Sequence, residues 1–171
     1  QSVCSQTYKH WIMYIIDDGS TDDSVTVIKK IIKNEPRIQL IRLTENIGAA
    51  QARNAALEVA NSRFVAFLDS DDIWYAEKLE KQVSFMLKNK YPISFTSYKQ
   101  VDQNGKSDGG IIRSVEKLNQ LDYLKNTVIG FSTSMIDTKY VGNDFRFIDI
   151  RTRQDTSLWI SMLGRGFVAY G

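Results

Sequence analysis

The chain has 171 residues, of which 43% are hydrophobic and 25% charged, and its formal net charge is +2. This composition is typical of one globular domain that folds without a disulfide or a structural metal. Lysines and arginines are spread along the chain rather than gathered into a stripe, so we expect no nucleic-acid partner. Cys4 is the only cysteine and His10 the only histidine, which excludes an internal disulfide and a Cys/His zinc site.

The first part of the chain alternates between two kinds of hydrophobic periodicity. Residues 11–16 predict a strand, and apolar residues between 25 and 32 fall on one helical face. Residues 38–43 alternate as a strand, and an alanine-rich helix is expected over 49–60. Residues 64–68 form a continuous apolar run, which predicts a strand buried on both faces at the centre of a sheet.

The second part of the chain continues this alternation less regularly. Asn104-Gly105 is a strong signal for a tight turn that folds the chain back on itself. The other elements are expected in this order: a helix over 79–87, a strand over 92–101, a helix over 116–125, a strand over 131–136, a helix over 156–163 and a strand over 167–170. Strands alternating with helices predict an α/β domain with a mixed, mostly parallel central sheet flanked by helices.

Two groups of aspartates follow predicted strands. Asp17 and Asp18 come directly after the first strand, and the continuous apolar run is followed by a second group, Asp69, Asp71 and Asp72. In open α/β sheets, ligands bind at the carboxyl ends of the strands. A turn or a helix cap explains one carboxylate at such a place, whereas three within four positions repel one another unless a cation or a partner compensates. The second group therefore indicates a binding site.

The acidic groups also indicate a cofactor. An anionic ligand such as a nucleoside diphosphate can lie beside carboxylates only if a divalent cation lies between them. An all-oxygen site suits Mg²⁺ or Mn²⁺. The sequence contains no glycine-rich loop ending in Gly-Lys-Ser/Thr, which would bind phosphates through backbone amides. We therefore expect phosphate binding through the metal and a few basic groups.

Four short segments resemble the donor-binding motifs of family 2 glycosyltransferases, in the order and spacing of that family. They are 14–22 (YIIDDGSTD), 46–48 (NIG), 52–56 (ARNAA) and 67–74 (FLDSDDIW). A later segment, Gln154-Asp155 followed by Leu158-Trp159, resembles the one that carries the catalytic base of the family. The resemblance covers residues 6–171 and implies the GT-A type of Rossmann-like nucleotide-binding domain.

The resemblance implies roles for the acidic residues. Asp17 or Asp18 would contact the base or ribose of the donor nucleotide. Asp69 and Asp71 occupy the Asp-x-Asp positions, where they would bind the donor and the Mg²⁺ or Mn²⁺ ion. Asp155 would be the general base, although its place at the start of a predicted helix also suits an N-cap.

Arg53, in the alanine-rich helix, leaves two interpretations open: a solvated or sheet-edge guanidinium, or one that neutralises the diphosphate of the donor. The activity implied by the resemblance is metal-dependent transfer of a hexose, with inversion, from a nucleoside-diphosphate sugar to a hydroxyl group. The implied acceptor is a saccharide or a lipid-linked saccharide, in surface polysaccharide or lipid-linked oligosaccharide assembly. The implied location is the cytoplasm or the inner face of the membrane.

Two alternatives to this activity stay open. The first is a nucleotide-sugar-binding module without catalysis. The second is a sugar nucleotidyltransferase, which ordinarily needs a glycine-rich or basic triphosphate loop near its start, and the sequence shows none.

Members of the family begin with a further strand, and the first residues of this chain resemble the helix that follows it. We therefore expect a single, N-terminally truncated domain, with a nucleotide-binding part over about 1–100 and an acceptor-side part over about 101–171. The free edge beside residues 11–16 would then invite self-association. Any peripheral membrane contact would come from segments outside this chain.

Overall fold

The strands form three groups in the computed structural model, which describes residues 1–102 and 105–171, without the side chain of Asp108. β1 (Met13–Asp17) pairs in parallel with β2 (Ile38–Arg42). β5 (Tyr98–Val101) and β6 (Ser107–Ile112) form an antiparallel hairpin. The third group is a five-stranded sheet in the order β3 (Phe64–Ala66), β8 (Met135–Asp137), β4 (Ile93–Ser94), β9 (Ala169–Tyr170) and β7 (Lys117–Leu118).

The five-stranded sheet is mixed, as predicted, with more antiparallel pairs than expected. β4 and β9 are parallel, whereas β8 runs antiparallel to both β3 and β4, and β7 runs antiparallel to β9. β8 enters between two strands that share a direction, so one inserted strand creates two antiparallel ladders. β3 lies at the end of this sheet, not at its centre as predicted, because its only ladder among the described residues is the one with β8.

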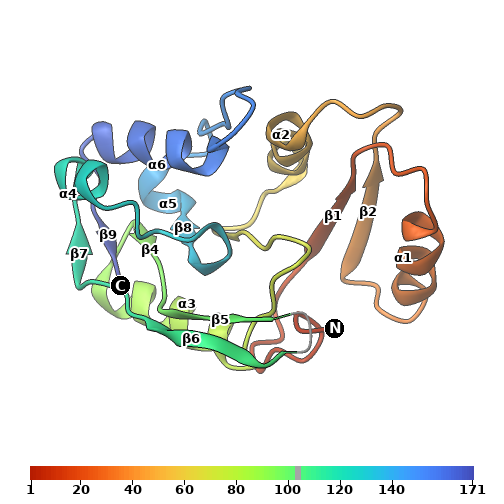
Figure 1. Cartoon of the computed structure of the whole chain (residues 1–171), viewed down its shortest axis with the longest axis horizontal. Coiled ribbons are helices and arrows are strands. Elements are labelled where there is room, and N and C mark those ends of the chain that lie inside the picture. Colours follow the sequence, from red (N-terminus) through yellow and green to blue (C-terminus); the bar gives the residue numbers. More distant parts are fainter. Residues whose placement is uncertain (103–104) are drawn as a thin grey trace.

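The described helices are α1 (Ser24–Ile32), α2 (Ala49–Val59), α3 (Lys78–Asn89), α4 (Gln120–Lys125), α5 (Thr138–Val141) and α6 (Gln154–Gly164). α1 packs against β2, and helices cover both faces of the five-stranded sheet. α6 lies above the sheet and α3 below it in the view of Figure 1. None of the described helices combines the length and the apolarity needed to cross a membrane.

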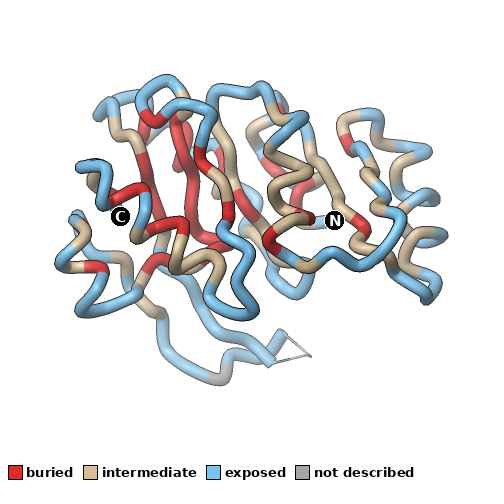
Figure 2. Tube along the Cα trace, turned by 90° about the horizontal axis from the view of Figure 1, so that it is seen from above, coloured by how far each residue is buried: buried red, intermediate tan, exposed pale blue. Residues whose placement is uncertain are grey.

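The hydrophobic core consists of two clusters on opposite faces of β8. Ile136 belongs to the cluster that contains Trp159 of α6, and Met135 belongs to the cluster that contains Met86 of α3. Consecutive side chains of a strand point to opposite faces, so one short strand contributes to both clusters. The buried segments gather around the five-stranded sheet (Figure 2).

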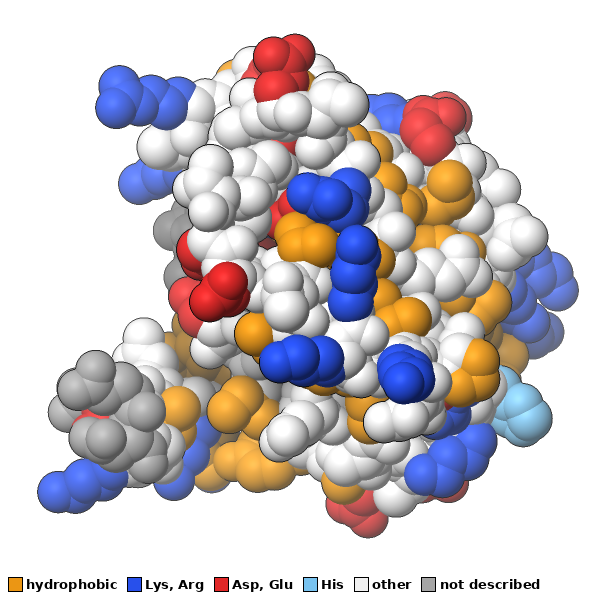
Figure 3. Space-filling model, turned by 90° about the vertical axis from the view of Figure 1, so that its right-hand side faces the viewer, with side chains coloured by type: hydrophobic (Ala, Val, Ile, Leu, Met, Phe, Trp, Pro, Cys, Tyr) orange, Lys and Arg blue, Asp and Glu red, His pale blue; other side chains and the backbone are white. Residues whose placement is uncertain are grey.

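The part of the molecule formed by α1, β1 and β2 is less buried. α1 has no buried residue, and Val27 and Ile31 are exposed. On this face, hydrophobic side chains lie among lysines and arginines (Figure 3). Among the described residues, β1 forms a ladder with β2 and with no other strand. Self-association through its second edge stays a prediction.

Two predicted strands differ from the observed elements. Residues 92–101 split into β4 and β5, and residues 131–136 begin as the 3-10 helix Phe131–Thr133 before β8. Hydroxyl groups explain the 3-10 helix, because Thr133 donates to the Gly130 carbonyl at 2.6 Å and Ser134 to the Phe131 carbonyl at 2.7 Å. The predicted turn includes Asn104, which lies outside the described residues, and the hairpin of β5 and β6 confirms that the chain folds back.

Candidate functional site

Asp18 joins the carboxyl end of β1 to the loop before α2. Its Oδ1 accepts a hydrogen bond from the Ile47 backbone N–H at 2.8 Å, and its Oδ2 accepts one from Gly48 at 2.9 Å. The carboxylate therefore fixes the start of α2 next to β1. Each oxygen keeps a further lone pair for a ligand.

Asp17 is buried at the end of β1, with 4% of its surface exposed. Its Oδ1 accepts a hydrogen bond from the Ser20 backbone N–H at 3.4 Å. Its Oδ2 lies 3.5 Å from Arg42 Nε and has no hydrogen-bond partner among the described residues. Hydrogen bonding from Ser20 holds the pKa of Asp17 below its usual value, against the opposing effect of burial. Asp17 is thus an anion, and its Oδ2 has an ion pair with Arg42 but accepts no hydrogen bond from the described residues.

Gly19 follows these aspartates with a φ of +75°, and an added Cβ would lie 2.8 Å from the backbone nitrogen of Asn46. We expect Gly19→Ala to lower the free energy of unfolding by about 2 kcal/mol or more, because backbone strain and a backbone clash add. Gly48→Ala is the matched control, since Gly48 has a φ of +88° and nothing within 4 Å of its added Cβ. Urea denaturation measures both losses. Equal losses would contradict the contact between Gly19 and Asn46.

Arg53, in α2, brings three segments of the chain together. Its NH2 group donates to Asp69 Oδ1 and its NH1 group to Gln154 Oε1, each at 2.9 Å. The guanidinium also lies over the Phe131 ring, 4.3 Å from the ring centroid. With 25% of its side chain exposed and two hydrogen-bond partners, Arg53 is not a solvated guanidinium. It lies at the acidic group, as the second interpretation of this residue requires.

The acidic group after β3 carries the charge repulsion expected from its sequence. Burial raises the pKa of Asp69, Arg53 opposes this effect, and the charges of Asp72 and Asp71 raise it further. Asp71 and Asp72 are exposed, and neither carboxylate forms a hydrogen bond or an ion pair with the part of the chain that the structure describes. The guanidinium of Arg53 therefore supplies positive charge at Asp69.

A network of polar side chains is attached to the backbone of the acidic group after β3. The backbone N–H of Asp69 donates to Ser132 Oγ at 2.9 Å, and Trp74 Nε1 donates to the Ser132 carbonyl at 2.7 Å. Lys78 Nζ lies 4.2 Å from the centroid of the Trp74 ring and donates to Gln82 Oε1 at 2.7 Å. Burial lowers the pKa of Lys78 to about 7. Sequence reasoning missed Ser132, because a serine in an irregular segment carries no local signal.

Asp155 lies in the first turn of α6, and the N-cap of that helix is Arg153. The N-cap alternative for Asp155 is therefore wrong. Within the described ranges, its carboxylate forms no hydrogen bond or ion pair. Burial raises the pKa of Tyr123 to about 12, and the charge of nearby Asp155 contributes to this rise. Its role as a general base stays a prediction.

Asn54 is a second residue that sequence reasoning did not assign. Its Nδ2 donates to the Phe147 carbonyl at 2.9 Å, and its Oδ1 accepts from the Phe147 backbone N–H at 2.8 Å. These two bonds attach the segment before α6 to α2. The ARNAA string contains Asn54 beside Arg53, so the motif itself was the available signal.

α2 connects the two acidic groups. Its N-cap, Gly48, donates to Asp18, and its Arg53 donates to Asp69. The expectation that Asp17 or Asp18 faces Asp71 across one crevice stays a prediction. So does the metal site, because among residues 1–102 and 105–171 no group of three or more His, Cys, Asp or Glu side chains is arranged to hold a metal ion.

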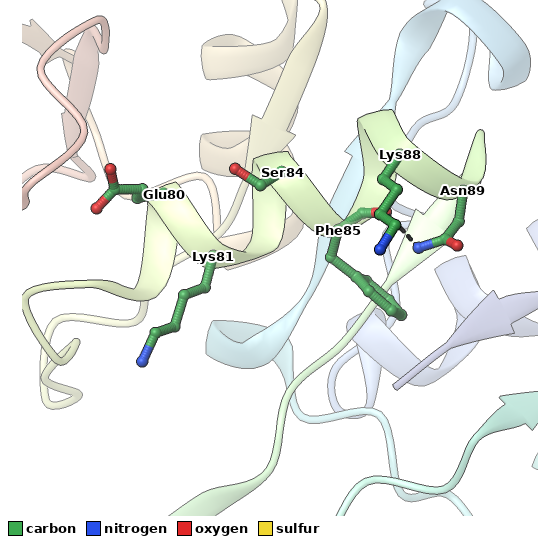
Figure 4. A pocket seen from close by; sticks show the side chains of 6 residues that line it. All are labelled: Glu80, Lys81, Ser84, Phe85, Lys88 and Asn89. Atoms are coloured by element: carbon green, nitrogen blue, oxygen red, sulfur yellow. Dashed lines mark hydrogen bonds between the residues drawn. The ribbon is translucent and has the colours of Figure 1, made fainter.

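A hollow on the outer face of α3 contains none of the predicted site residues. It is lined by Glu80, Lys81, Ser84, Phe85, Lys88 and Asn89 (Figure 4). The polar groups in this view spread along one helix and do not converge on a point. The hollow is therefore not a candidate for the donor site.

The fold identifies a class of protein. Two solved GT-A glycosyltransferase structures share it: S. aureus TarS 1–349 in complex with UDP, and the mannosyltransferase PcManGT from Pyrobaculum calidifontis in complex with GDP-Man and Mn²⁺. The TarS structure has a TM-score of 0.78 and 22% identity, over 95% of this chain and 49% of that one. The PcManGT structure has a TM-score of 0.73 and 16% identity, over 99% of this chain and 48% of that one. These comparisons confirm the predicted GT-A fold.

The sequence then identifies the family. The family model described as glycosyl transferase family 2 matches residues 1–150, and the chain belongs to this family. It is 47% identical over 170 residues to the putative teichuronic acid biosynthesis glycosyltransferase TuaG of Bacillus subtilis (strain 168), over 99% of this chain and 67% of that protein. It is 40% identical over 162 residues to the UDP-Glc:alpha-D-GlcNAc-diphosphoundecaprenol beta-1,3-glucosyltransferase WfgD of Escherichia coli, over 95% of this chain and 62% of that protein. The chain thus spans about two thirds of the length of these relatives.

Proposed function

We propose that this protein is an inverting glycosyltransferase that moves a sugar from a nucleoside-diphosphate donor to a lipid-diphosphate-linked saccharide, in the assembly of a surface polysaccharide. One observation carries the proposal: Arg53 contacts both Asp69, in the donor motif, and Gln154, which adjoins the candidate base. Two segments far apart in sequence, each with its own expected role, thereby meet at one side chain. The names of the relatives support the acceptor class, since WfgD acts on a diphosphoundecaprenol-linked sugar and TuaG is assigned to teichuronic acid biosynthesis.

The residues around α2 would bind the donor. Asp17, held as an anion, would accept hydrogen bonds from the nucleoside, and Asp18 would keep the loop before α2 in place. Asp69 and Asp71 would hold a Mg²⁺ or Mn²⁺ ion, which stabilises the departing diphosphate when it is bound. Arg53 would bring a second positive charge to the same diphosphate.

α6 would carry the residue that activates the acceptor. Asp155 would take the proton of the acceptor hydroxyl as that oxygen attacks the anomeric carbon, because an alcohol is a poor nucleophile at neutral pH. Direct displacement by this oxygen inverts the configuration. The nucleotide-binding part would extend over about 1–100 and the acceptor-side part over about 101–171. The protein would act in the cytoplasm near the inner face of the membrane.

A panel of nucleotide sugars, read by thermal shift with Mn²⁺ present, tests the proposal. A donor at a hundred times its Kd stabilises the folded state by about 2.7 kcal/mol, so the matching donor raises the melting temperature by a few degrees. The free sugar phosphate is the control, because it lacks the nucleoside that Asp17 is expected to bind. No stabilisation by any nucleotide sugar would contradict the proposal. Donor binding without hydrolysis or transfer would favour the inactive binding module.

A further inference from the structure

The segment between α5 and α6 is fixed to α2 at both of its ends. Asn54 holds the backbone of Phe147 through two hydrogen bonds, and Arg53 donates to Gln154 Oε1. Gln154 Nε2 in turn donates to the Ile150 carbonyl at 2.8 Å, which draws the chain back toward α6. The segment lies beside α2 in Figure 1. We call residues 148–153 the 148–153 loop.

The loop concentrates arginines that have no partner. Six arginines form ion pairs, namely Arg37, Arg42, Arg53, Arg63, Arg146 and Arg165. The other three are Arg113, Arg151 and Arg153, whose side chains form no ion pair or hydrogen bond with any residue that the structure describes. Two of these three unpaired guanidiniums, Arg151 and Arg153, lie in the short loop that leads to Asp155. Both residues are exposed.

Arg153 also has an unusual backbone conformation. Its φ of 60° is left-handed, which Lys90 alone shares among the described residues other than glycine. For a side chain of this size, that conformation costs about 1 kcal/mol or more, and it starts the helix that carries Asp155. Glycine or asparagine would meet the same backbone requirement at lower cost. The backbone conformation at position 153 therefore does not explain why this residue is an arginine.

The same loop exposes apolar side chains. Ile148 is 55% exposed and Ile150 is 39% exposed, and each stands close in sequence to an unpaired arginine. Asp149 is the one carboxylate of the loop, against two guanidiniums. The surface therefore suits a ligand that joins a compact, multiply charged anion to a hydrocarbon chain. Arginine binds the oxygens of phosphate groups through its fork of N–H donors, and isoleucine excludes water around an alkyl chain.

We propose that the 148–153 loop binds the lipid diphosphate of the acceptor, with Arg151 and Arg153 on the diphosphate and Ile148 and Ile150 against the adjoining hydrocarbon. The inference rests on the proposed function, because it names the part of the protein that recognises that acceptor. Asp155 follows Arg153 closely in the first turn of α6. A diphosphate held on the loop therefore brings the attached sugar toward the candidate base.

Titration with farnesyl diphosphate tests this site without turnover. EDTA is present, so that the aspartates cannot bind the diphosphate through a metal. We expect the wild-type chain to bind the probe and R151A/R153A to weaken binding roughly tenfold or more, as for the loss of charge-assisted hydrogen bonds. R113A is the matched control, because it removes the third unpaired guanidinium, and we expect no more than about a twofold change. R151K/R153K keeps the positive charges but lacks the paired N–H donors of the guanidinium groups. Its affinity should therefore lie between those of the wild type and R151A/R153A.

The apolar half of the site has its own comparison. I148S/I150S should weaken the binding of farnesyl diphosphate and leave that of inorganic diphosphate unchanged. Unchanged melting temperatures show that these exposed variants stay folded.

Three results would overturn the inference. The first is that the wild-type chain does not bind farnesyl diphosphate. The second is that the wild type and R151A/R153A bind it with equal affinity. The third is that phosphatidylglycerol vesicles bind as strongly as farnesyl diphosphate and depend as much on Arg151 and Arg153. The last result would mean a contact with membrane charge rather than with a diphosphate. Failure of the proposed function is distinguishable, because it appears as a lack of stabilisation by nucleotide sugars in a measurement that contains no lipid.

Discussion

Asp155→Asn is expected to lower the rate of sugar transfer by a factor of roughly a hundred to ten thousand, the usual contribution of a positioned general base. The substitution keeps the size of the side chain and removes its ability to take a proton. Donor binding should change little, since the donor residues lie on other elements. The melting temperature should also change little, because the carboxylate forms no hydrogen bond or ion pair in the described part of the chain and is not the N-cap of α6.

Single-turnover transfer, donor titration and thermal unfolding measure these three quantities. Asp23→Asn is the matched control, because it makes the same chemical change at an exposed carboxylate that forms no side-chain cap hydrogen bond and lies outside the proposed donor, acceptor and base residues. Its transfer rate should stay within a few-fold of the wild type. An Asp155→Asn variant that retains transfer would show that the general base is elsewhere.

Asp71→Asn is expected to remove most of the metal dependence of donor binding. The anionic diphosphate is repelled by unscreened carboxylates, and a carboxamide binds Mg²⁺ or Mn²⁺ less well than a carboxylate. With Mn²⁺ present, donor affinity should fall by roughly tenfold to a hundredfold or more. Loss of a residue that only supports a metal ligand has an effect of that size, and loss of a ligand should cost at least as much. Asp71 is a cleaner choice than Asp69, because Asp69 also pairs with Arg53.

Titrations of the donor with Mn²⁺ and with EDTA give the metal-dependent part of the affinity. Asp72→Asn is the control, since Asp72 is a neighbouring exposed carboxylate outside the Asp-x-Asp positions. We expect the wild type to lose donor affinity in EDTA and Asp71→Asn to respond little. A wild-type affinity that EDTA leaves unchanged would contradict the metal assignment of Asp69 and Asp71.

Hydrophobic periodicity was sufficient to predict most elements and the α/β class. β1, β2, α2 and α3 lie close to their predicted ranges, because an apolar face is a local property of a strand or a helix. The acidic group after β3 was also visible in the sequence, since its repulsion depends on residues that adjoin one another. The order of the donor motifs indicated the family that the comparisons confirm.

Other features depended on how the elements pack. The place of β3 at the end of its sheet follows from β8, which lies far away in sequence and supplies its only described ladder. The N-cap of α6 is Arg153 rather than the preferred type of residue, because a left-handed residue starts the helix there. Neither local propensity nor periodicity contains this information.

The sequence by itself determined which residue types are available for chemistry, namely the two acidic groups, Arg53 and Asp155. Only the tertiary structure decided that Arg53 contacts both Asp69 and Gln154, and that Asn54 holds the segment leading to the 148–153 loop. The physical reason is the range of the forces. Periodic burial is set by neighbours along the chain, whereas a hydrogen bond between distant side chains exists only once packed helices and strands have brought the donor and the acceptor within about 3 Å of each other.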